Sequence, residues 1–336
     1  MSVTAAYNKE AATKDWIMDR NFALEAVRVT EAAALASSHW TGRGKEKDAD
    51  QAAVNAMREA LNGLTIDGTV VIGEGERDKA PMLYIGEKVG TGEGPQIDIA
   101  LDPLEGTTLC ATNGPNSLAV VAMAEHGGFL HAPDVYMDKI AVGGGLPEGV
   151  VDLDNSVSAN LKSLASALKK DISELTVVIL KRDRHEEKIA HLREAGARVQ
   201  LIPDGDVAGV IATATPTTGI DMYFGIGGAP EGVLAAAALR CIGGQMQGRL
   251  LFDGEDEQKE RAARMGITDF TRKYTMLDMA RGDVMFAATG VTDGSMLKGV
   301  KRWPGGASTH SIVMRSATGT VRWIEALHNF GLKTEI

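Results

Sequence analysis

The sequence contains very little cysteine. Only Cys110 and Cys241 occur in 336 residues; they lie far apart, and neither belongs to a C-x-x-C pair. A disulfide framework or a zinc ribbon needs several closely spaced cysteines, so we expect neither. The cysteine content therefore favours a reduced, intracellular compartment.

Long apolar runs are also missing. No stretch approaches the roughly 18 consecutive apolar residues that a membrane-spanning helix needs. The first residues, MSVTAAYNKEAATKDW, carry acidic side chains and lack the apolar core of a secretory signal. We therefore expect a cytoplasmic protein with no membrane partner.

Positive charge is in the minority. The chain has 35 Lys and Arg against 45 Asp and Glu, a formal net charge of −10. A general nucleic-acid-binding surface needs a basic face, so we expect no nucleic-acid partner. An anionic substrate is still compatible with this balance, because bound cations can reverse the sign of a local site.

Three common catalytic signatures are absent. The phosphate-binding pattern G-x-x-x-x-G-K-[ST] does not occur. The run from Gly225 to Gly232 has Pro230 where a dinucleotide fingerprint needs its last glycine, which makes a nicotinamide dehydrogenase a distant alternative. His185 and His191 do not have the i, i+4 spacing of a zinc protease.

The patterns that are present indicate an α/β protein. Apolar residues at helical spacing predict one helix from Asp19, a plausible N-cap, to Ser38 and another from about Asp48 to Asn62. Short β-branched runs that end in glycine or an acid predict strands within 68–76, 97–108 and 117–124.

Further along the chain, predicted strands and helices alternate. The expected strands are 175–180, 197–202, 221–224, 284–289 and 311–315, and the expected helices are 185–194, 206–214, 231–240 and 254–264. Such alternation predicts a largely parallel sheet with helices on both faces. The glycine-rich stretch 141–160 predicts a domain junction, so we expect an N-terminal domain over 1–150 and a C-terminal domain over 151–336.

The strongest functional signal is Asp102-Pro103-Leu104-Glu105-Gly106-Thr107-Thr108, directly after a predicted strand. Ligands of α/β proteins usually bind at the carboxyl ends of strands. Pro103 and Gly106 predict a tight turn, and a helix that starts at Glu105 or Gly106 presents free N–H groups to a phosphate. Carboxylates repel a phosphate unless hard cations lie between them, and Mg²⁺ prefers such oxygen ligands. The alternative is a strand end and a helix cap.

Three other acids are weaker candidates. Glu74 lies in Gly73-Glu74-Gly75-Glu76 after a predicted strand, Asp50 lies near the start of a predicted helix, and Glu231 follows Pro230 in a predicted first turn. The positive end of a helix dipole favours an acid without any metal. A structural role therefore explains each acid at least as well as metal ligation on local evidence.

Two short clusters have the chemistry of sugar-phosphate contacts. Lys181-Arg182-Asp183-Arg184-His185 is locally basic in an acidic chain and follows a predicted strand. Asp204-Gly205-Asp206 follows the next predicted strand and offers acceptors for sugar hydroxyls. A second phosphate needs a second positive site, which the basic cluster supplies. A solvated face, a turn and an N-cap are the structural alternatives.

Together these segments resemble the class II fructose-1,6-bisphosphatases of the lithium-sensitive, metal-dependent phosphatase superfamily. D-P-x-E-G-T marks the superfamily, and the glycine-rich segments mark the class. The resemblance is carried by RVTEAAALA (28–36), VVIGEGERDKAPMLYIGEKVG (70–90), DPLEGTT (102–108), HAPDVYMDKIAVG (131–143), IPDGDVAG (202–209), GIGGAPEGV (225–233) and ATGVTDG (288–294).

The resemblance implies a layered α/β/α/β/α sandwich and hydrolysis of fructose 1,6-bisphosphate in gluconeogenesis. It implies that Mg²⁺ or Mn²⁺ is the cofactor and that the protein is a homo-oligomer, a dimer or a tetramer. The implied metal ligands are Asp50, Glu74, Asp102, Glu105 and Glu231. The implied substrate contacts are Glu105, Gly106 and Thr107 for the 1-phosphate, Tyr136, Arg182 and Arg184 for the 6-phosphate, and Asp204, Gly205, Asp206 and Gly228 for the sugar. Asp183 is a further implied substrate contact. Thr107 and Asp50 are the implied catalytic residues.

The sequence departs from the family pattern at one loop. The family commonly has a lysine four residues before the aspartate that corresponds to Asp50, whereas Glu46 stands there in this chain, between Lys45 and Lys47. Arg182-Asp183-Arg184 also lacks the proline that commonly separates the two basic residues. Two alternatives stay open: a phosphatase for sedoheptulose 1,7-bisphosphate or an inositol phosphate, and a catalytically weak regulator that binds metal and sugar phosphate.

Overall fold

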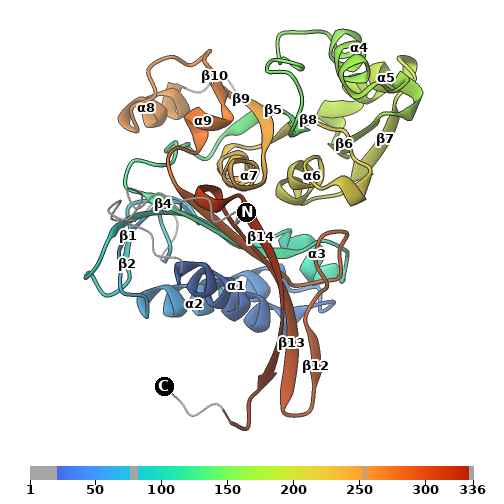
Figure 1. Cartoon of the computed structure of the whole chain (residues 1–336). Helices are drawn as coiled ribbons and strands as arrows, with labels where there is room; N and C mark the ends of the chain where they lie inside the picture. The colour runs from blue at the N-terminus through green and yellow to red at the C-terminus, as the bar shows by residue number, and fades with distance from the viewer. Residues whose placement is uncertain (1–20, 76–81, 253, 255, 333–336) are drawn as a thin grey trace, which may run out of the picture.

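A computed structural model describes residues 21–75, 82–252, 254 and 256–332. Two β-sheets dominate this part of the chain, and helices lie outside and between them (Figure 1). No helix among the described residues is both long and apolar enough to cross a lipid bilayer.

The larger sheet has the strand order β12-β13-β11-β4-β3-β1-β2, and β14 pairs with the other edge of β13. Its strands are β1 (Asp67–Ile72), β2 (Lys88–Val89), β3 (Gln96–Glu105), β4 (Leu118–Glu125), β11 (Val284–Gly290), β12 (Lys301–Trp303), β13 (Gly306–Arg315) and β14 (Thr320–Asn329). β1 and β3 run parallel, and the other described pairs of this sheet are antiparallel.

The smaller sheet has the strand order β10-β9-β5-β8-β6-β7. Its strands are β5 (Tyr136–Gly143), β6 (Thr176–Leu180), β7 (Arg198–Ile202), β8 (Met222–Gly228), β9 (Gly244–Leu251) and β10 (Lys273–Thr275). β6 is parallel to both β7 and β8, while β5 is antiparallel to β8 and β9. The prediction of a largely parallel sheet is therefore correct for β6, β7 and β8. It is wrong for the other strand pairs of this sheet, which are antiparallel.

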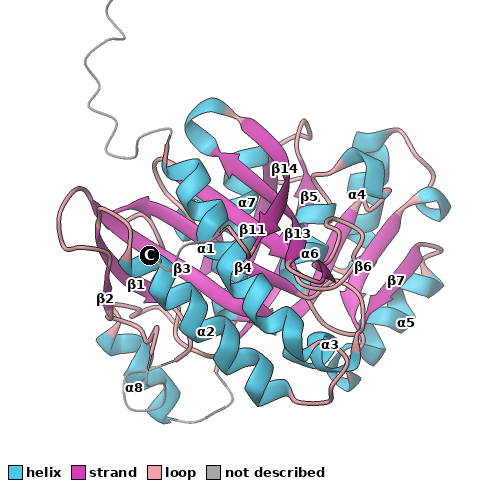
Figure 2. Cartoon of the chain, turned by 90° about the horizontal axis from the view of Figure 1, so that it is seen from below, coloured by secondary structure: helices cyan, strands magenta, loops and turns pink. Residues whose placement is uncertain are grey.

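Helices complete five layers, which confirms the α/β/α/β/α sandwich. The helices α1 (Phe22–Ser37) and α2 (Glu46–Asn62) cover the outer face of the larger sheet (Figure 2). α6 (Asp206–Ala212) and α7 (Ala229–Ile242) lie between the sheets, and α4 (Val157–Leu168) and α5 (Glu186–Glu194) cover the smaller sheet from outside. Other helices of the described chain are α3 (Thr107–Thr112), α8 (Asp256–Arg264) and α9 (Met276–Met279).

The central helix α7 and the outer helix α2 are buried to different extents, and each packs in its own apolar core. Most residues of α7 are buried, including the run from Ala235 to Leu239, because one side of this helix meets the larger sheet and another meets the smaller one. A helix that is apolar all round is typical of such a central position. In α2, by contrast, one face is buried, and Met57 and Leu61 have no exposed area. Each of these two side chains stabilises the fold by about 2 kcal/mol.

The ends of the two N-terminal helices differ slightly from the prediction. The first helix begins at Phe22 with Asn21 as its N-cap, and the predicted cap Asp19 lies outside the described residues. The second helix begins at Glu46, two residues before the predicted start.

The division into domains at residue 150 stays a prediction. The sheets themselves take their strands from different parts of the chain. The larger sheet contains strands from before Tyr136 and after Thr275, and the smaller sheet contains the strands between them.

Candidate active site

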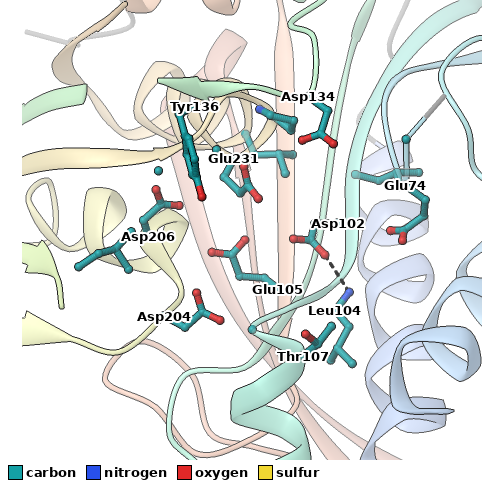
Figure 3. A pocket seen from close by; sticks show the side chains of 18 of the residues that line it. Glu74, Asp102, Leu104, Glu105, Thr107, Asp134, Tyr136, Asp204, Asp206 and Glu231 are labelled. Atoms are coloured by element: carbon teal, nitrogen blue, oxygen red, sulfur yellow. Dashed lines mark hydrogen bonds between the residues drawn. The ribbon is translucent and has the colours of Figure 1, made fainter. Parts of the chain in front are cut away.

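A cavity of about 420 Å³ lies where the ends of elements from both sheets meet (Figure 3). From the larger sheet and its helices it receives the predicted residues Asp50, Glu74, Asp102, Glu105, Gly106 and Thr107. From the smaller sheet and the central helices it receives Tyr136, Arg182, Arg184, Asp204, Asp206, Gly228 and Glu231. Residues that are distant in sequence therefore share one cavity.

The Asp102–Glu105 segment is still part of β3, which corrects the predicted tight turn. Its pairing with β4 shifts register between Asp102 and Glu105. Pro103 has no N–H to donate to the ladder, and such irregularities commonly accompany proline in a strand. The N–H of Leu104 donates to Asp102 Oδ1 at 3.0 Å. The helix α3 then begins at Thr107, after Gly106 at φ +77°, one residue after Gly106 and two after Glu105, the two predicted starts.

Glu105 is a buried acid and Glu231 a partly buried one with a buried Oε2, and Figure 3 shows both pointing into the cavity. Glu105 Oε1 accepts the N–H of Val207 at 3.2 Å. Burial, followed by the charges of Asp102 and Asp206, raises the pKa of Glu105 well above its usual range. Burial and Asp206 raise the pKa of Glu231 to about 7.

A second group of acids continues the cavity toward α2. Burial, followed by the charges of Asp102 and Asp50, raises the pKa of Glu74 to about 8. Burial raises the pKa of Asp102 to about 6, although hydrogen bonds with Glu105 and Leu104 act in the opposite direction. Burial also raises the pKa of Asp50. These acids resist ionisation because they are desolvated beside one another.

The donor chemistry fits divalent cations. Glu105 Oε2 and Glu231 Oε2 are buried and have no hydrogen-bond partner, so each needs a proton or a cation. Oxygen ligands of this kind are those that Mg²⁺ and Mn²⁺ take. Within the described ranges, no three His, Cys, Asp or Glu side chains are already grouped as a metal site. The carboxylates therefore share a cavity without forming a closed cage.

Two glycines let the backbone pass close to these acids. A Cβ on Gly228 would lie 1.8 Å from Glu231 Oε2, so any side chain there would displace that carboxylate. A Cβ on Gly73 would lie 2.1 Å from the carbonyl oxygen of Leu83, beside the backbone of Glu74. A side chain at Gly228 would collide with the predicted ligand Glu231, and one at Gly73 would collide with the backbone next to the predicted ligand Glu74.

Basic and aromatic side chains form another part of the cavity wall. The Arg184 guanidinium lies 4.5 Å from the centroid of the Tyr136 ring and donates from Nη2 to the carbonyl of Ile226 at 2.9 Å. Arg182 Nη2 lies 3.2 Å from Asp204 Oδ1. Tyr136 is 44% exposed, so this wall is open to solvent and to an anionic ligand.

Behind this wall, His185 connects the loop to β8. Its Nδ1 lies 2.7 Å from the carbonyl of Leu180, and its Nε2 accepts the N–H of Ile226 at 2.8 Å. Burial lowers the pKa of His185. The imidazole is thus a neutral structural link rather than a zinc ligand, which agrees with the spacing argument from the sequence.

Two of the predicted substrate contacts do not line this cavity. Asp183 is exposed, and Gly205, at φ +80°, lines an adjoining cavity of about 290 Å³ instead. Their substrate roles stay predictions. Lys45 lies 3.5 Å from Asp48, and neither Lys45 nor Lys47 lines the active-site cavity. Glu76 lies outside the described residues.

Two residues were missed by the sequence analysis. Asp134 lines the cavity just before β5 (Figure 3). Lys139 is completely buried in β5, and its Nζ lies 2.5 Å from Asp206 Oδ2. The signal for Lys139 was available, because a lysine between strand-forming residues in Tyr136–Gly143 needs an acidic partner when the strand is buried.

Comparison with known proteins gives consistent matches. Residues 20–328 match the family described as bacterial fructose-1,6-bisphosphatase, glpX-encoded. The fructose-1,6-bisphosphatase 1 class 2 of Escherichia coli (strain K12) is 49% identical over 324 residues, which cover 93% of this chain and 96% of that protein. The fructose-1,6-bisphosphatase class 2 of Shigella flexneri matches with the same identity and coverage.

Among solved structures, the inositol monophosphatase from Anabaena (Nostoc) sp. PCC 7120 aligns with a TM-score of 0.30 and 16% identity. The alignment covers 58% of this chain and 72% of that one. The family match and the relatives span almost the whole chain, and the conclusion rests on them. The chain belongs to the bacterial, glpX-encoded fructose-1,6-bisphosphatase family.

Proposed function

We propose that this protein hydrolyses the 1-phosphate of D-fructose 1,6-bisphosphate, giving fructose 6-phosphate and inorganic phosphate with the help of divalent cations. The observation that carries the proposal is the 49% identity to a class 2 fructose-1,6-bisphosphatase over 93% of the chain. Membership of the family implies a divalent metal, and the choice of Mg²⁺ or Mn²⁺ is part of the proposal.

The acidic part of the cavity is the proposed metal and 1-phosphate site. Asp50, Glu74, Asp102, Glu105 and Glu231 are the proposed ligands. Their raised pKa values and the two orphan oxygens support this assignment, because a cation would relieve both the repulsion and the missing contacts. Bound cations would neutralise the charge of the transferring phosphoryl group and lower the pKa of the attacking water.

The protein's own groups then position the ester. Gly106 and Thr107 begin α3 at the cavity, so their backbone N–H groups are available to phosphoryl oxygens. Thr107 has a hydroxyl and lines the same cavity as the carboxylates of Asp102 and Glu105 (Figure 3). We assign to it, together with Asp50, the orientation and deprotonation of the attacking water.

The basic part of the cavity is the proposed 6-phosphate site. Arg184 and Tyr136 already stack on each other, which holds the guanidinium at the wall with its remaining N–H donors free for phosphate oxygens. Arg182 is balanced by Asp204 and would exchange this partner for the phosphate. A bisphosphate is thus matched by two sites of different chemistry at one cavity.

The test is phosphate release from fructose 1,6-bisphosphate by the purified full chain. We expect one phosphate per sugar with Mg²⁺ or Mn²⁺, no release in EDTA, and recovery when metal is restored. Sedoheptulose 1,7-bisphosphate, inositol 1-phosphate and fructose 6-phosphate are the comparison substrates. Full activity in EDTA would contradict the metal mechanism, and a higher kcat/KM for a comparison substrate would contradict the proposed substrate.

A further inference from the structure

Lys139 is a buried cation beneath the active-site cavity. It has no solvent-exposed area and does not line the cavity, so it does not contact a substrate there. Its Nζ donates to Asp206 Oδ2 at 2.5 Å and to the carbonyl oxygen of Gly228 at 2.9 Å. Taking a lysine out of water is costly, and only well-formed contacts such as these offset the cost.

Glycines make the space that Lys139 occupies. A Cβ on Gly227 would lie 2.9 Å from Lys139 Nζ and only 1.9 Å from Asp206 Oδ2. A Cβ on Gly232 would lie 3.3 Å from Lys139 Cδ and 2.6 Å from Met137 Sδ. The glycine-rich segment at the end of β8 and the start of α7 is therefore required by this ion pair, which explains a motif that is not a dinucleotide fingerprint.

The ion pair joins the first turns of the two central helices. Asp206 is the first residue of α6, and Gly228 is the N-cap of α7. Tyr223 donates from its hydroxyl to the same Asp206 oxygen at 3.2 Å. Lys139 thus connects both helix starts to the middle of β5.

Each of these helix starts holds one of the buried acids. The N–H of Val207, the residue after Asp206, donates to Glu105 Oε1 at 3.2 Å. Glu231 lies in the first turn of α7, and its Oε2 is adjacent to Gly228. A shift of either helix start would therefore change the separation of Glu105 and Glu231.

We infer that Lys139 is a positioning residue for the metal site. By holding Asp206 and the Gly228 carbonyl together, it sets the spacing of Glu105 and Glu231, and so the affinity for the divalent cation that they take. The inference rests on the proposed function, because that proposal identifies these two acids as metal ligands.

The first test replaces Lys139 with methionine, which has a similar length and no charge. Mn²⁺ binding to the full chain is measured by calorimetry in the absence of substrate, and thermal unfolding is measured in metal-free buffer. Changes in residues that orient metal ligands usually weaken metal affinity by about 10- to 100-fold, and we expect this range for Lys139→Met.

The matched control is Lys188→Met. Lys188 also pairs with an aspartate, Asp138, at 3.0 Å, and it does not line the cavity. We expect its Mn²⁺ affinity to stay within about twofold of the parent, since it is not connected to the helix starts that hold the acids.

A second variant covers the case in which Lys139→Met does not fold. Lys139→Met combined with Asp206→Asn leaves no unpaired buried charge, so it should recover thermal stability. If Lys139 positions the acids, this double variant still binds Mn²⁺ at least about tenfold more weakly than the parent. If the double variant recovers both stability and Mn²⁺ affinity, the role of Lys139 is only structural and the inference is wrong.

The parent chain separates the two proposals. A parent that binds no Mn²⁺ would overturn the proposed metal site itself. A parent that binds Mn²⁺, with both variants within about twofold of it, would overturn only the positioning role of Lys139.

Discussion

At the scale of single residues, the cavity is unusual because its acids are costly to ionise. Asp102 lies near the middle of this group, and its charge contributes to the raised pKa values of Glu74, Glu105 and Glu231. A carboxylate in this position interacts both with Glu74 and with the pair Glu105 and Glu231. Its loss should therefore affect metal binding more than the loss of a peripheral acid.

The first prediction concerns Asp102→Asn. Because an amide cannot replace a negatively charged ligand, we expect kcat for fructose 1,6-bisphosphate to fall at least about 10²-fold. The measurement is steady-state phosphate release at saturating Mg²⁺. Asp48→Asn is the control, since Asp48 lies outside the cavity and pairs with Lys45. Near-normal turnover of purified Asp102→Asn would show that Asp102 is not a ligand.

The second prediction concerns Thr107→Ala. If the hydroxyl orients the attacking water, its removal should lower kcat more than it raises KM, because the interaction is made in the transition state. The two constants are measured under the same metal conditions. Thr108→Ala serves as the neighbouring control, because Thr108 does not line the cavity. A change in KM alone would mean that Thr107 only binds the ester.

The third prediction is the pH dependence of stability without metal. The pKa of Glu74 is raised to about 8 and that of Glu231 to about 7, so the folded chain binds more protons than the unfolded chain above about pH 5. The free energy of unfolding should therefore fall as pH rises from about 5 to about 8. Acids with lowered pKa values, such as Asp98 and Asp152, act below this window, near and under about pH 4.

Urea unfolding in EDTA at several pH values within that window is the measurement. Saturating Mn²⁺ should remove most of the slope, because the cation takes the place of the protons. Stability that rises with pH in EDTA would contradict the raised pKa values.

At the scale of structural elements, the loop after β6 brings Arg182 and Arg184 to the cavity wall. The loop includes the short 3₁₀ turn Asp183–His185. The hydrogen bond between His185 and Ile226 of β8 fixes the backbone of this turn, and so fixes the position of Arg184 at the cavity. The charge of this loop, rather than that of the acidic cluster, should select for a second phosphate.

The fourth prediction follows for Arg184→Ala. We expect KM for fructose 1,6-bisphosphate to rise about tenfold or more, since a charge-assisted contact to the distal phosphate is lost, while kcat changes less. Lys181→Ala is the matched control, because Lys181 is a neighbouring exposed cation that does not line the cavity. Equal effects of the two substitutions would indicate a general charge effect instead of a contact.

Elements that form an uninterrupted run of strand- or helix-forming residues were predictable, and others were hidden by glycine or polar residues. β6, β7, α5 and α7 were predicted because each is such a run and its ends are marked by polar residues, glycine or proline. β9 was not predicted, since its glycines and glutamines conceal a strand in which alternate residues are buried. β14 was not predicted either, because its exposed Trp323 and Leu327 obscure the alternation.

The residues of the site were easier to predict than their contacts. Motif resemblance placed Glu74, Asp102 and Glu231 together. Nothing in their sequence positions says that the ends of β1 and β3 and the start of α7 meet at one cavity. The Lys139–Asp206 pair joins residues 67 positions apart. Contacts of this kind depend on the pairing of strands, which local patterns do not contain.

At the scale of the whole molecule, the first and last strands of the described chain, β1 and β14, belong to one sheet. β14 pairs with β13 from Gly306–Asn329 to Arg315–Thr320, and β13 pairs with β11. The C-terminal strand therefore protects an edge that the rest of the larger sheet depends on.

The fifth prediction tests that dependence. A chain that ends at Gly319 lacks β14 and leaves the edge of β13 that faced β14 unpaired, so we expect most of the expressed protein to be insoluble. A chain that ends at Leu332 keeps β14 and is the control. The soluble fraction and the thermal unfolding temperature are the measurements. Soluble, normally stable protein without β14 would show that this strand is dispensable.

The interleaving of the two sheets has a consequence for biosynthesis. β4 leaves the ribosome before every strand of the smaller sheet, yet its partner β11 is made only after all of them. Until then, the apolar segment Leu118–Glu125 has an open edge that invites mispairing. The nascent chain therefore assembles the acids of the cavity late, when translation is nearly complete, and a chaperone that shields β4 in the meantime should raise the yield.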